Sequence, residues 1–424
     1  MMNKDKIVMT ILGSAGGLAK ALLSLLNRAS RDEDNPIYQQ IHDSTFHLID
    51  YNQKPLDYYR DICPNLISRL HIHQVDLKDT IILRNALKSS ETSIVIDASL
   101  ADTVEMLDCC NQLGIHYVNS SLENIYIADH NSNYKGFPLV ERIRFFEKYK
   151  DEYDNLKAIV CSGMSPGVVQ WMAIELMNKY PNEQPLGCFI VEQDTSFFKN
   201  QTAAKKNIVY TAWSPECFLN QAIQGYPMFM HHQTPLFFYE QVYDLEFKVT
   251  LGDKQFYGCL MAHEDSYSLC SQFNMEGGYL YKINEHTTNL IRSHLDHPDK
   301  IWKLDREVLI PCVSPLSGED LVGVLLVYPD KESYMYHTLS NEAAFVQSKT
   351  NAAYFQAACG LYAALAVLLK DSIANGVYYV DELLLNTCNH YGRYLSYYLT
   401  DFISGENRET DGLIFDRMKH LRKR

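Results

Sequence analysis

Short apolar runs alternate with amphipathic stretches through residues 1–160. The apolar runs have the length and β-branched content of buried strands, and the stretches between them repeat apolar residues at helical spacing. Strands that alternate with helices in this way predict an α/β fold with a doubly wound parallel sheet of the Rossmann type. The strand-like runs lie at 6–12, 46–50, 71–77, 93–99, 116–119 and 157–161, and the helical stretches at 17–28, 81–87, 104–113 and 138–149.

The pattern changes after residue 163. Longer strand-like runs with aromatic residues at 186–194 and 242–263 indicate an open mixed sheet. An Ala-rich stretch at 351–369 is apolar on most faces, so we expect a helix buried between layers. The chain is thus predicted to contain a Rossmann domain at 1–160, an α+β substrate-binding domain at 161–345, and C-terminal helices at 346–424 that pack back on the Rossmann domain.

The C-terminal part carries the most apolar segment of the chain. Residues 354–369 come nearest to a membrane-spanning helix, but Gln356 interrupts them and they are shorter than a span needs, so we expect a buried helix. Residues 386–402 are rich in tyrosine and predict a further helix. The basic residues 417–424 are expected to fray at the end of the chain.

Composition narrows the class of protein. A hydrophobic content of 46% and a charged content of 21% are those of a soluble globular chain. The net charge of −14 argues against nucleic acid and anionic membrane as partners and suits a cationic substrate. The 11 cysteines include no CxxC pair, so we expect reduced thiols in a cytoplasmic protein. The histidine pairs at 71/73 and 231/232 lack the spacing of metal ligands, and no metal is expected.

A glycine turn joins the first predicted strand to its helix. It fits G-x-x-G-x-x-A rather than G-x-G-x-x-G: Gly13 makes the turn, Gly16 lets a pyrophosphate approach the backbone, and Ala19 keeps the helix close to the sheet. The phosphates are expected at the helix N-terminus. Asp50, at the end of the second strand, is placed to accept from ribose hydroxyls and to repel a 2′-phosphate, which favours NAD over NADP. A glycine turn that holds no cofactor is the alternative.

An indole and two acids gather around a predicted strand end and helix start. Glu192, Trp213 and Glu216 suit an organic cation, because the ring face and the carboxylates both attract positive charge, although a lone tryptophan is often part of a core. His263 precedes two acids and is placed to relay protons near neutral pH, or is a satisfied surface histidine. The turn at 161–167 follows the last Rossmann strand, where nicotinamide and substrate meet in such folds, or it is a plain inter-domain turn.

Arginine is absent between Arg144 and Arg292. Enzymes that act on amino or keto acids usually hold the carboxylate with a bidentate arginine. A substrate domain without one fits a diamine better than an amino acid, although Lys205 and Lys206 are possible substitutes.

The chain resembles the bacterial homospermidine synthases, members of the saccharopine dehydrogenase-like group. The most specific match is TAWSPECF, which is similar to the family's Thr-Trp-Ser-x-Glu-x-Phe signature with an extra alanine before Trp213. The other matching blocks are IVIDAS, HYVNSSLE, CSGMSPGVVQW, VEQDT, LMAHEDS, VGVLLVYPDKESYMYHT, NAAYFQAACGLYAALAVL and GVYYVDEL.

The resemblance implies a redox-neutral reaction on tightly held NAD in a homodimer. Putrescine is oxidised to an imine, a second amine displaces ammonia, and the hydride returns to the Schiff base to give homospermidine. The resemblance implies catalytic roles for Glu192, Trp213 and His263. The expected substrate-binding residues are Glu216, Gln221 and Glu264. The expected cofactor-binding residues are Gly13, Ser14, Ala15, Gly16, Gly17, Asp50, Asp97, Ser99, Ser165 and Pro166.

The chain departs from the family at three places. Gln221 stands where the family has a glutamate eight residues after the tryptophan, and Ser165 stands for an asparagine. Residues 228–233 replace a glycine-rich segment that ends in His-Glu. Two further hypotheses therefore stay open: an NAD(P)-dependent dehydrogenase of the saccharopine or carboxynorspermidine type, and a non-catalytic protein that binds NAD.

Overall fold

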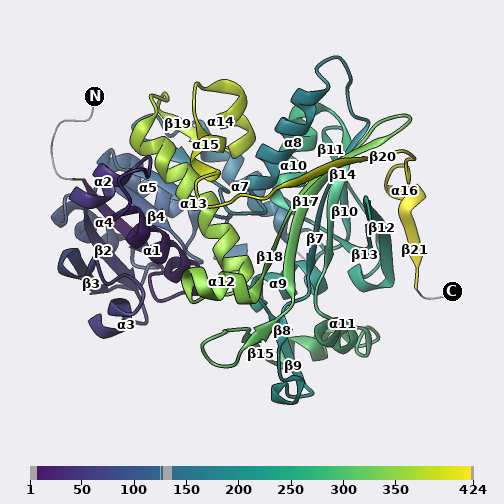
Figure 1. Ribbon diagram of the computed structural model, residues 1–424, viewed down its shortest axis with the longest axis horizontal. Helices are drawn as coiled ribbons and strands as arrows, with labels where there is room; N and C mark the ends of the chain where they lie inside the picture. The colour runs from purple at the N-terminus through teal and green to yellow at the C-terminus, as the bar shows by residue number, and fades with distance from the viewer. Residues whose placement is uncertain (1–6, 125, 128–135, 422–424) are drawn as a thin grey trace.

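Two large β-sheets, one parallel and one mixed, are joined by a long buried helix in the computed structural model of the chain, which describes residues 7–124, 126–127 and 136–421 (Figure 1). The parallel sheet is built mainly from the N-terminal part of the chain, and the mixed sheet from residues after 186. The two sheets lie in the left and right halves of Figure 1.

The parallel sheet has seven strands in the order β19-β6-β5-β4-β1-β2-β3, and every neighbouring pair is parallel. Helices cover its faces, which confirms the doubly wound Rossmann architecture. Its strands are β1 (Val8–Leu12), β2 (Thr45–Asp50), β3 (Leu70–Gln74), β4 (Ile94–Asp97), β5 (His116–Asn119), β6 (Lys157–Ile159) and β19 (Gly376–Tyr378). Its helices are α1 (Gly17–Ala29), α2 (Tyr38–Asp43), α3 (Leu56–Arg60), α4 (Thr80–Ser89), α5 (Thr103–Leu113) and α7 (Pro138–Lys150).

The mixed sheet has ten strands, eight of them in the order β20-β18-β17-β7-β14-β13-β12-β21, with β10 pairing β14 and β11 pairing β10. Its strands are β7 (Gly187–Asp194), β10 (Met228–His231), β11 (Thr234–Phe237), β12 (Leu245–Leu251), β13 (Lys254–Met261), β14 (Glu276–Lys282), β17 (Glu319–Val327), β18 (Glu332–Ser340), β20 (Ile403–Asn407) and β21 (Met418–His420). Two small pairs flank it: β8 (Phe197–Phe198) with β16 (Leu316–Ser317), and β9 (Ile208–Thr211) with β15 (Asp305–Val308). The helices of this half are α8 (Val168–Lys179), α9 (Pro215–Leu219), α10 (Glu264–Phe273), α11 (Glu285–Arg292) and α12 (Asn341–Ser348).

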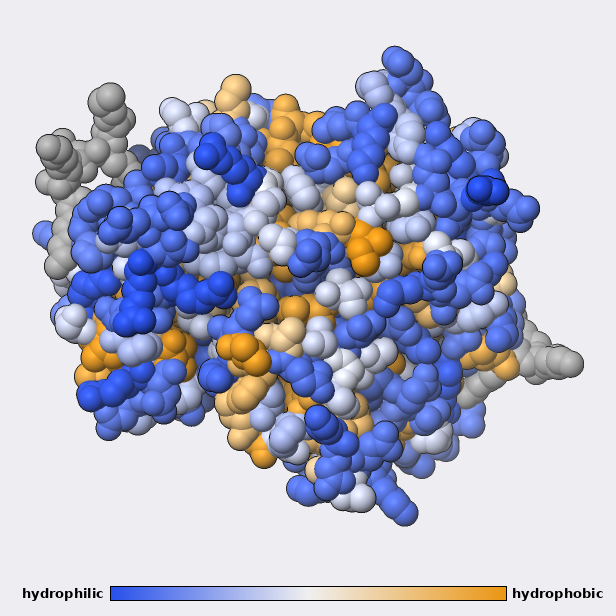
Figure 2. All heavy atoms as spheres, viewed as in Figure 1, coloured by the Kyte–Doolittle hydropathy of each residue, from blue (hydrophilic) through white to orange (hydrophobic). Residues whose placement is uncertain are grey.

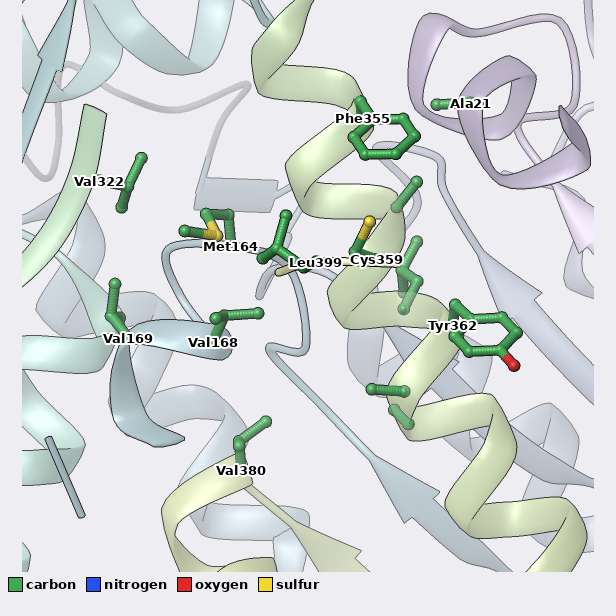
Figure 3. Close-up of a cluster of buried hydrophobic side chains, with 14 of the residues drawn as sticks. Ala21, Met164, Val168, Val169, Val322, Phe355, Cys359, Tyr362, Val380 and Leu399 are labelled. Carbon is green, nitrogen blue, oxygen red and sulfur yellow. The ribbon is translucent and has the colours of Figure 1, made fainter. Parts of the chain in front are cut away.

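The buried helix α13 (Ala352–Lys370) packs against α1 of the first half and against β17 and β18 of the second. Figure 3 shows Phe355, Cys359 and Tyr362 on this helix in one cluster of buried apolar side chains with residues of α1 and α8. By length and composition the helix resembles a membrane span, but 78% of that window is buried inside the protein. The prediction of a buried helix is therefore confirmed. The outer surface in Figure 2 is mostly hydrophilic, with small separated apolar patches.

The C-terminal part differs from the prediction of helices alone. It supplies β19 to the parallel sheet and β20 and β21 to the two edges of the mixed sheet, between the short helices α14 (Val380–Asn386), α15 (Tyr391–Leu395) and α16 (Ile414–Arg417). Most of the Tyr-rich stretch at 386–402 is not helical: α15 covers only Tyr391–Leu395, although Tyr391, Tyr394 and Tyr398 are all buried. The prediction that residues 417–424 fray is also wrong, since β21 pairs with β12. Residues 422–424 lie outside the described residues.

Candidate functional site

A cavity of about 410 Å³ lies between the carboxyl end of the parallel sheet and one face of the mixed sheet. This is the edge at which ligands bind in open α/β sheets. The structure brings most of the predicted site residues to this one cavity. The predicted residues that line it are Gly16, Gly17, Ser99, Ser165, Pro166, Glu192, Trp213, Glu216, Gln221, His263 and Glu264.

The glycine turn has the backbone that its motif predicts. Gly13 adopts a φ of +70°, and a Cβ there would lie 2.7 Å from the carbonyl oxygen of Ala98 on the neighbouring loop. Gly16 caps α1, and its N–H donates to the Gly13 carbonyl (3.0 Å). The turn therefore presents bare backbone and a helix N-terminus to the cavity, which is the geometry that accepts a phosphate group.

Gly17 has no side chain because an aromatic ring of α13 fills that place. A Cβ on Gly17 would lie 2.2 Å from the ring of Tyr354, which also lines the cavity. We expect Gly17→Ala to cost about 1–3 kcal/mol of unfolding free energy, as overpacking does, and to weaken dinucleotide binding. Thermal unfolding and NAD titration measure both effects. The loss in Gly17→Ala combined with Tyr354→Ala should be smaller than the sum of the two single losses, because the added methyl group no longer meets the ring. Gly17→Ala as stable as the wild type would contradict this packing account.

Two predicted cofactor-binding acids are held by the protein's own groups. Asp50 accepts from the N–H groups of Ala15 (2.9 Å) and Asn52 (2.7 Å), so it fixes the glycine turn to the end of β2. Asp97 is buried behind the cavity wall, where it accepts from Ser99 Oγ (2.6 Å) and from the hydroxyl of Tyr117 (2.9 Å). Burial raises the pKa of Asp97. Neither acid lines the cavity, whereas Ser99, which is hydrogen-bonded to Asp97, does.

Gly13, Ser14 and Ala15 also lie outside the cavity lining. Ser14 is buried, and its hydroxyl lies 3.2 Å from the hydroxyl of Tyr59. These three residues form the part of the turn that precedes Gly16 and Gly17, and of the turn only Gly16 and Gly17 line the cavity.

Buried carboxylates collect on β7 and β17 at the far end of the cavity. Asp320 pairs with Asp194 in the strand register, and Glu192 lies on the same face, where it accepts from the Tyr279 hydroxyl (2.8 Å). Asp194 Oδ2 and Asp320 Oδ1 are buried and have no hydrogen-bond partner among the described residues. Burial raises the pKa of Glu192 to about 8, that of Asp194 to about 6 and that of Asp320 well above its usual value. Such unpaired oxygens are complementary to a cation that donates hydrogen bonds.

His263 is a buried cavity residue and not a surface histidine. Its Nδ1 lies 2.9 Å from Asp265 Oδ1 and 3.9 Å from the Glu264 carboxylate, and its ring stacks on Tyr279 with centroids 4.1 Å apart. Burial opposes the charged imidazolium, but the charge and hydrogen bond of Asp265, with Glu264 and Glu192, raise the pKa to about 9. The imidazole therefore carries a proton at neutral pH.

Trp213 serves both the core and the cavity. It is half-buried, its Nε1–H donates to the Tyr281 hydroxyl (3.1 Å), and it lines the cavity beside α9. Glu216 lies at the rim, where it forms a salt bridge to Arg306 (3.4 Å) and keeps 55% of its side chain exposed. Gln221 is buried, and its Oε1 has no hydrogen-bond partner among the described residues.

An arginine reaches the cavity, contrary to the sequence expectation. Arg142 enters from α7, just outside the arginine-free interval, and forms a buried salt bridge to Glu123 (3.2 Å). Because Glu123 offsets its charge, the acids still predominate in the cavity wall. The charged lining residues are Glu123, Glu192, Glu216, Glu264 and Asp320 against Arg142 and His263. Among the described residues, no group of three or more histidine, cysteine or acidic side chains is arranged to hold a metal ion.

Comparison with known proteins identifies the fold. No family model and no curated protein matches the sequence. Among solved structures, L-Glu-forming saccharopine dehydrogenase from Saccharomyces cerevisiae matches with a TM-score of 0.55 and 9% identity, over 94% of this chain and 100% of that one. The UDP-glucose 4-epimerase of Thermotoga maritima (TM-score 0.24, 12% identity) covers 36% of this chain and 54% of its own. The NAD-bound enzyme WbmG of Bordetella bronchiseptica (TM-score 0.25, 10% identity) covers 47% and 66%.

The first of these matches spans nearly the whole chain. The protein therefore has a saccharopine dehydrogenase-like fold: a Rossmann-type parallel sheet followed by a second, mixed sheet. At 9% identity the likeness shows the fold alone.

Proposed function

We propose that the chain is an NAD-dependent, homospermidine synthase-like enzyme. In this reaction an aminobutyl group passes from one putrescine to a second putrescine, or to a related polyamine, with release of ammonia. The observation that carries the proposal is the excess of buried acids in a cavity that begins at the glycine turn of a Rossmann sheet. Buried carboxylates are costly unless a cation pairs with them, and a diamine or polyamine supplies that cation.

The residues of the glycine turn fit a nicotinamide dinucleotide. Gly16 leaves bare backbone at the cavity wall, Gly17 makes room for the Tyr354 ring beside it, and the N-terminus of α1 offers amide groups to a pyrophosphate. Asp50 lies at the end of β2, where a carboxylate favours NAD over NADP. NAD, when bound there, supplies the acceptor and donor of the hydride.

The other cavity residues suit the handling of amines. Glu192 and Asp320 lie where they would bind the ammonium group far from the reacting carbon. The face of Trp213 would stabilise cationic intermediates, and His263 would donate a proton to the departing ammonia. The enclosure of the cavity by both sheets would keep water from hydrolysing the imine.

The proposal is tested by incubating purified protein with putrescine and substoichiometric NAD. We expect homospermidine and ammonia in equal amounts by mass spectrometry and ammonia assay, with no accumulation of NADH absorbance. No product from putrescine, but NADH formed with another amine or an amino acid, would contradict the synthase. If the protein binds NAD but no amine gives product or NADH, the result would favour a non-catalytic protein.

A net dehydrogenase of the saccharopine or carboxynorspermidine type is the second candidate. Arg142 favours it, because a guanidinium in the cavity wall is able to bind a substrate carboxylate. This candidate predicts stoichiometric turnover of cofactor with a secondary amine that carries a carboxylate, which the same absorbance assay detects.

Trp213→Ala tests the aromatic platform. A desolvated cation–π contact contributes about 1–2 kcal/mol, so we expect kcat/KM for the amine to fall about 5- to 30-fold. Trp213→Phe is the matched control, since it retains a ring face and loses only the Nε1–H bond to Tyr281; it should keep most of the activity. Equal losses in both variants would assign the effect to packing instead.

A further inference from the structure

The carboxylate of Asp265 joins two parts of the site that come from different sheets. Asp265 is completely buried in the first turn of α10. Its Oδ1 accepts from His263 Nδ1 (2.9 Å) and from the N–H of Ser266 (2.7 Å). Its Oδ2 accepts from Ser165 Oγ (2.5 Å), in the turn that follows β6 of the parallel sheet. Both oxygens thus accept hydrogen bonds from the protein, and Asp265 does not line the cavity.

The Ser165 turn is fixed on its other side by α13. The N–H of Gly163 donates to the Pro166 carbonyl (2.8 Å), which closes the turn. A Cβ on Gly360 of α13 would lie 2.1 Å from the Gly163 carbonyl oxygen, so helix and turn are in direct contact. Ser165 and Pro166 both line the cavity. The turn can therefore shift only if Asp265 or α13 shifts with it.

The hydrogen bond to Asp265 also sets the orientation of the imidazole. With Nδ1 engaged, the second ring nitrogen, Nε2, is the one left for a ligand, and the residue lines the cavity. The groups that face the ring are Glu264 on its own helix, Glu192 on β7 and the stacked Tyr279 on β14. Among the described residues, none of these three makes a hydrogen bond to the imidazole, whereas Asp265 does.

We propose that Asp265 is the positioning residue of the site, which holds the His263 imidazole toward the substrate and ties it to the cofactor-facing Ser165 turn. The assignment of substrate and cofactor rests on the proposed function, but the linkage itself does not. It explains why a serine occupies position 165: a short hydroxyl reaches the Asp265 carboxylate and fixes the turn. The distance between His263 and the Ser165 turn is then fixed. A fixed distance is needed if His263 donates a proton, and the cofactor beside the turn accepts a hydride, at the same carbon–nitrogen bond.

Asp265→Asn tests the proposal, with Asp381→Asn as the matched control. Asp381 is an equally buried acid nearby on α14 that bonds to Gln170 and not to His263 or Ser165. In the NAD-loaded protein, ¹⁵N NMR titration of the imidazole should show the His263 midpoint lowered by about one to three pH units in Asp265→Asn, and unmoved in Asp381→Asn. The alkaline limb of the pH profile of kcat should move by the same amount.

Ser165→Ala separates the two halves of the linkage. It leaves the charge of Asp265 beside the imidazole, so the His263 midpoint should stay in place while NAD binds about tenfold more weakly, the effect of one charge-assisted hydrogen bond. This variant keeps the proposal testable should Asp265→Asn fail to fold. An unchanged midpoint in Asp265→Asn, or unchanged NAD affinity in Ser165→Ala, would overturn the proposal. Both readouts are independent of the amine, so failure of the synthase assay leaves them interpretable.

Discussion

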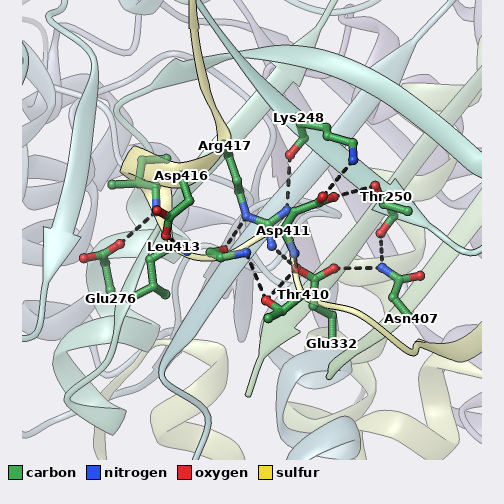
Figure 4. Close-up of polar contacts among 12 residues, drawn as sticks. Lys248, Thr250, Glu276, Glu332, Asn407, Thr410, Asp411, Leu413, Asp416 and Arg417 are labelled. Carbon is green, nitrogen blue, oxygen red and sulfur yellow. Dashed lines mark hydrogen bonds and ion pairs between the residues drawn. The ribbon is translucent and has the colours of Figure 1, made fainter. Parts of the chain in front are cut away.

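Arg417→Met is expected to lower the free energy of unfolding by about 3–5 kcal/mol, because it leaves a buried carboxylate without its counter-charge. Arg417 and Glu332 form an ion pair in which both side chains are fully buried (Figure 4). Arg417 also donates to the carbonyls of Gly412 (2.7 Å) and Lys248 (3.2 Å). Glu332 accepts from Asn407 (2.8 Å) and from the N–H of Asp411 (2.8 Å). The network ties the end of the chain across the mixed sheet.

Denaturant unfolding at neutral pH measures this effect. Glu332→Gln should cost a similar amount, and the double variant should lose less than the sum of the two, because the buried charge left by each single change disappears. Arg60→Met is the control: its salt bridge to Asp57 is highly exposed, and the loss should stay below about 0.5 kcal/mol. A cost for Arg417→Met as small as that of the control would show that the pair does not hold the C-terminal segment.

Asp320→Asn should move stability and amine binding in opposite directions. The raised pKa values of Asp320 and Glu192 mean that the folded, empty protein holds these protons more tightly than the unfolded chain does. The stability of the unliganded protein therefore falls as pH rises from about 4 toward 8, and replacing Asp320 with a neutral isostere removes part of that loss. We expect the variant to unfold at a higher temperature than wild type at pH 8 and at a similar one at pH 5.

Under the proposed function, the same change removes an anchor for an ammonium group. A hydrogen bond to a charged group contributes about 1.5–3 kcal/mol, so the Kd of the NAD-loaded protein for putrescine should rise about 10- to 150-fold. In the wild type, amine affinity should increase as pH rises through about 8, where Glu192 ionises, until the amine itself loses its proton. Calorimetric titration at several pH values measures both. Tighter amine binding by Asp320→Asn, or destabilisation at pH 8, would contradict the role assigned to the acids.

Local patterns predicted the short segments that line the cavity or support its wall. The turn at Gly13–Gly17, the acid at Asp50 and the pair Trp213 and His263 each stand in a recognisable context of strand end and helix start. Asp320 carries no such context. It reaches the cavity because β17 pairs with β7 and places it opposite Asp194. The sequence of either strand alone does not predict this long-range register.

The remaining errors have the same cause. Arg142 enters the cavity because α7 packs where the two sheets meet, so an argument restricted to the second half of the chain overlooked it. Arg417 looks like part of a basic tail, yet its partner Glu332 lies far away on β18. The β19 strand joins a sheet whose other strands all precede residue 160. Each of these three features depends on contacts between segments far apart in the sequence, and hydrophobic periodicity does not predict such contacts.

The central claim is that one hydride leaves an amine in this cavity and returns to the product. Its most direct test uses putrescine dideuterated at each terminal carbon, incubated with the NAD-loaded protein and an excess of unlabelled NADH. We predict homospermidine that retains every deuterium of the two putrescines, because the same hydride is returned before the cofactor exchanges. Homospermidine that lacks one deuterium would contradict the return of the same hydride. Deuterated NADH that accumulates without homospermidine would contradict the redox-neutral reaction and indicate a net dehydrogenase.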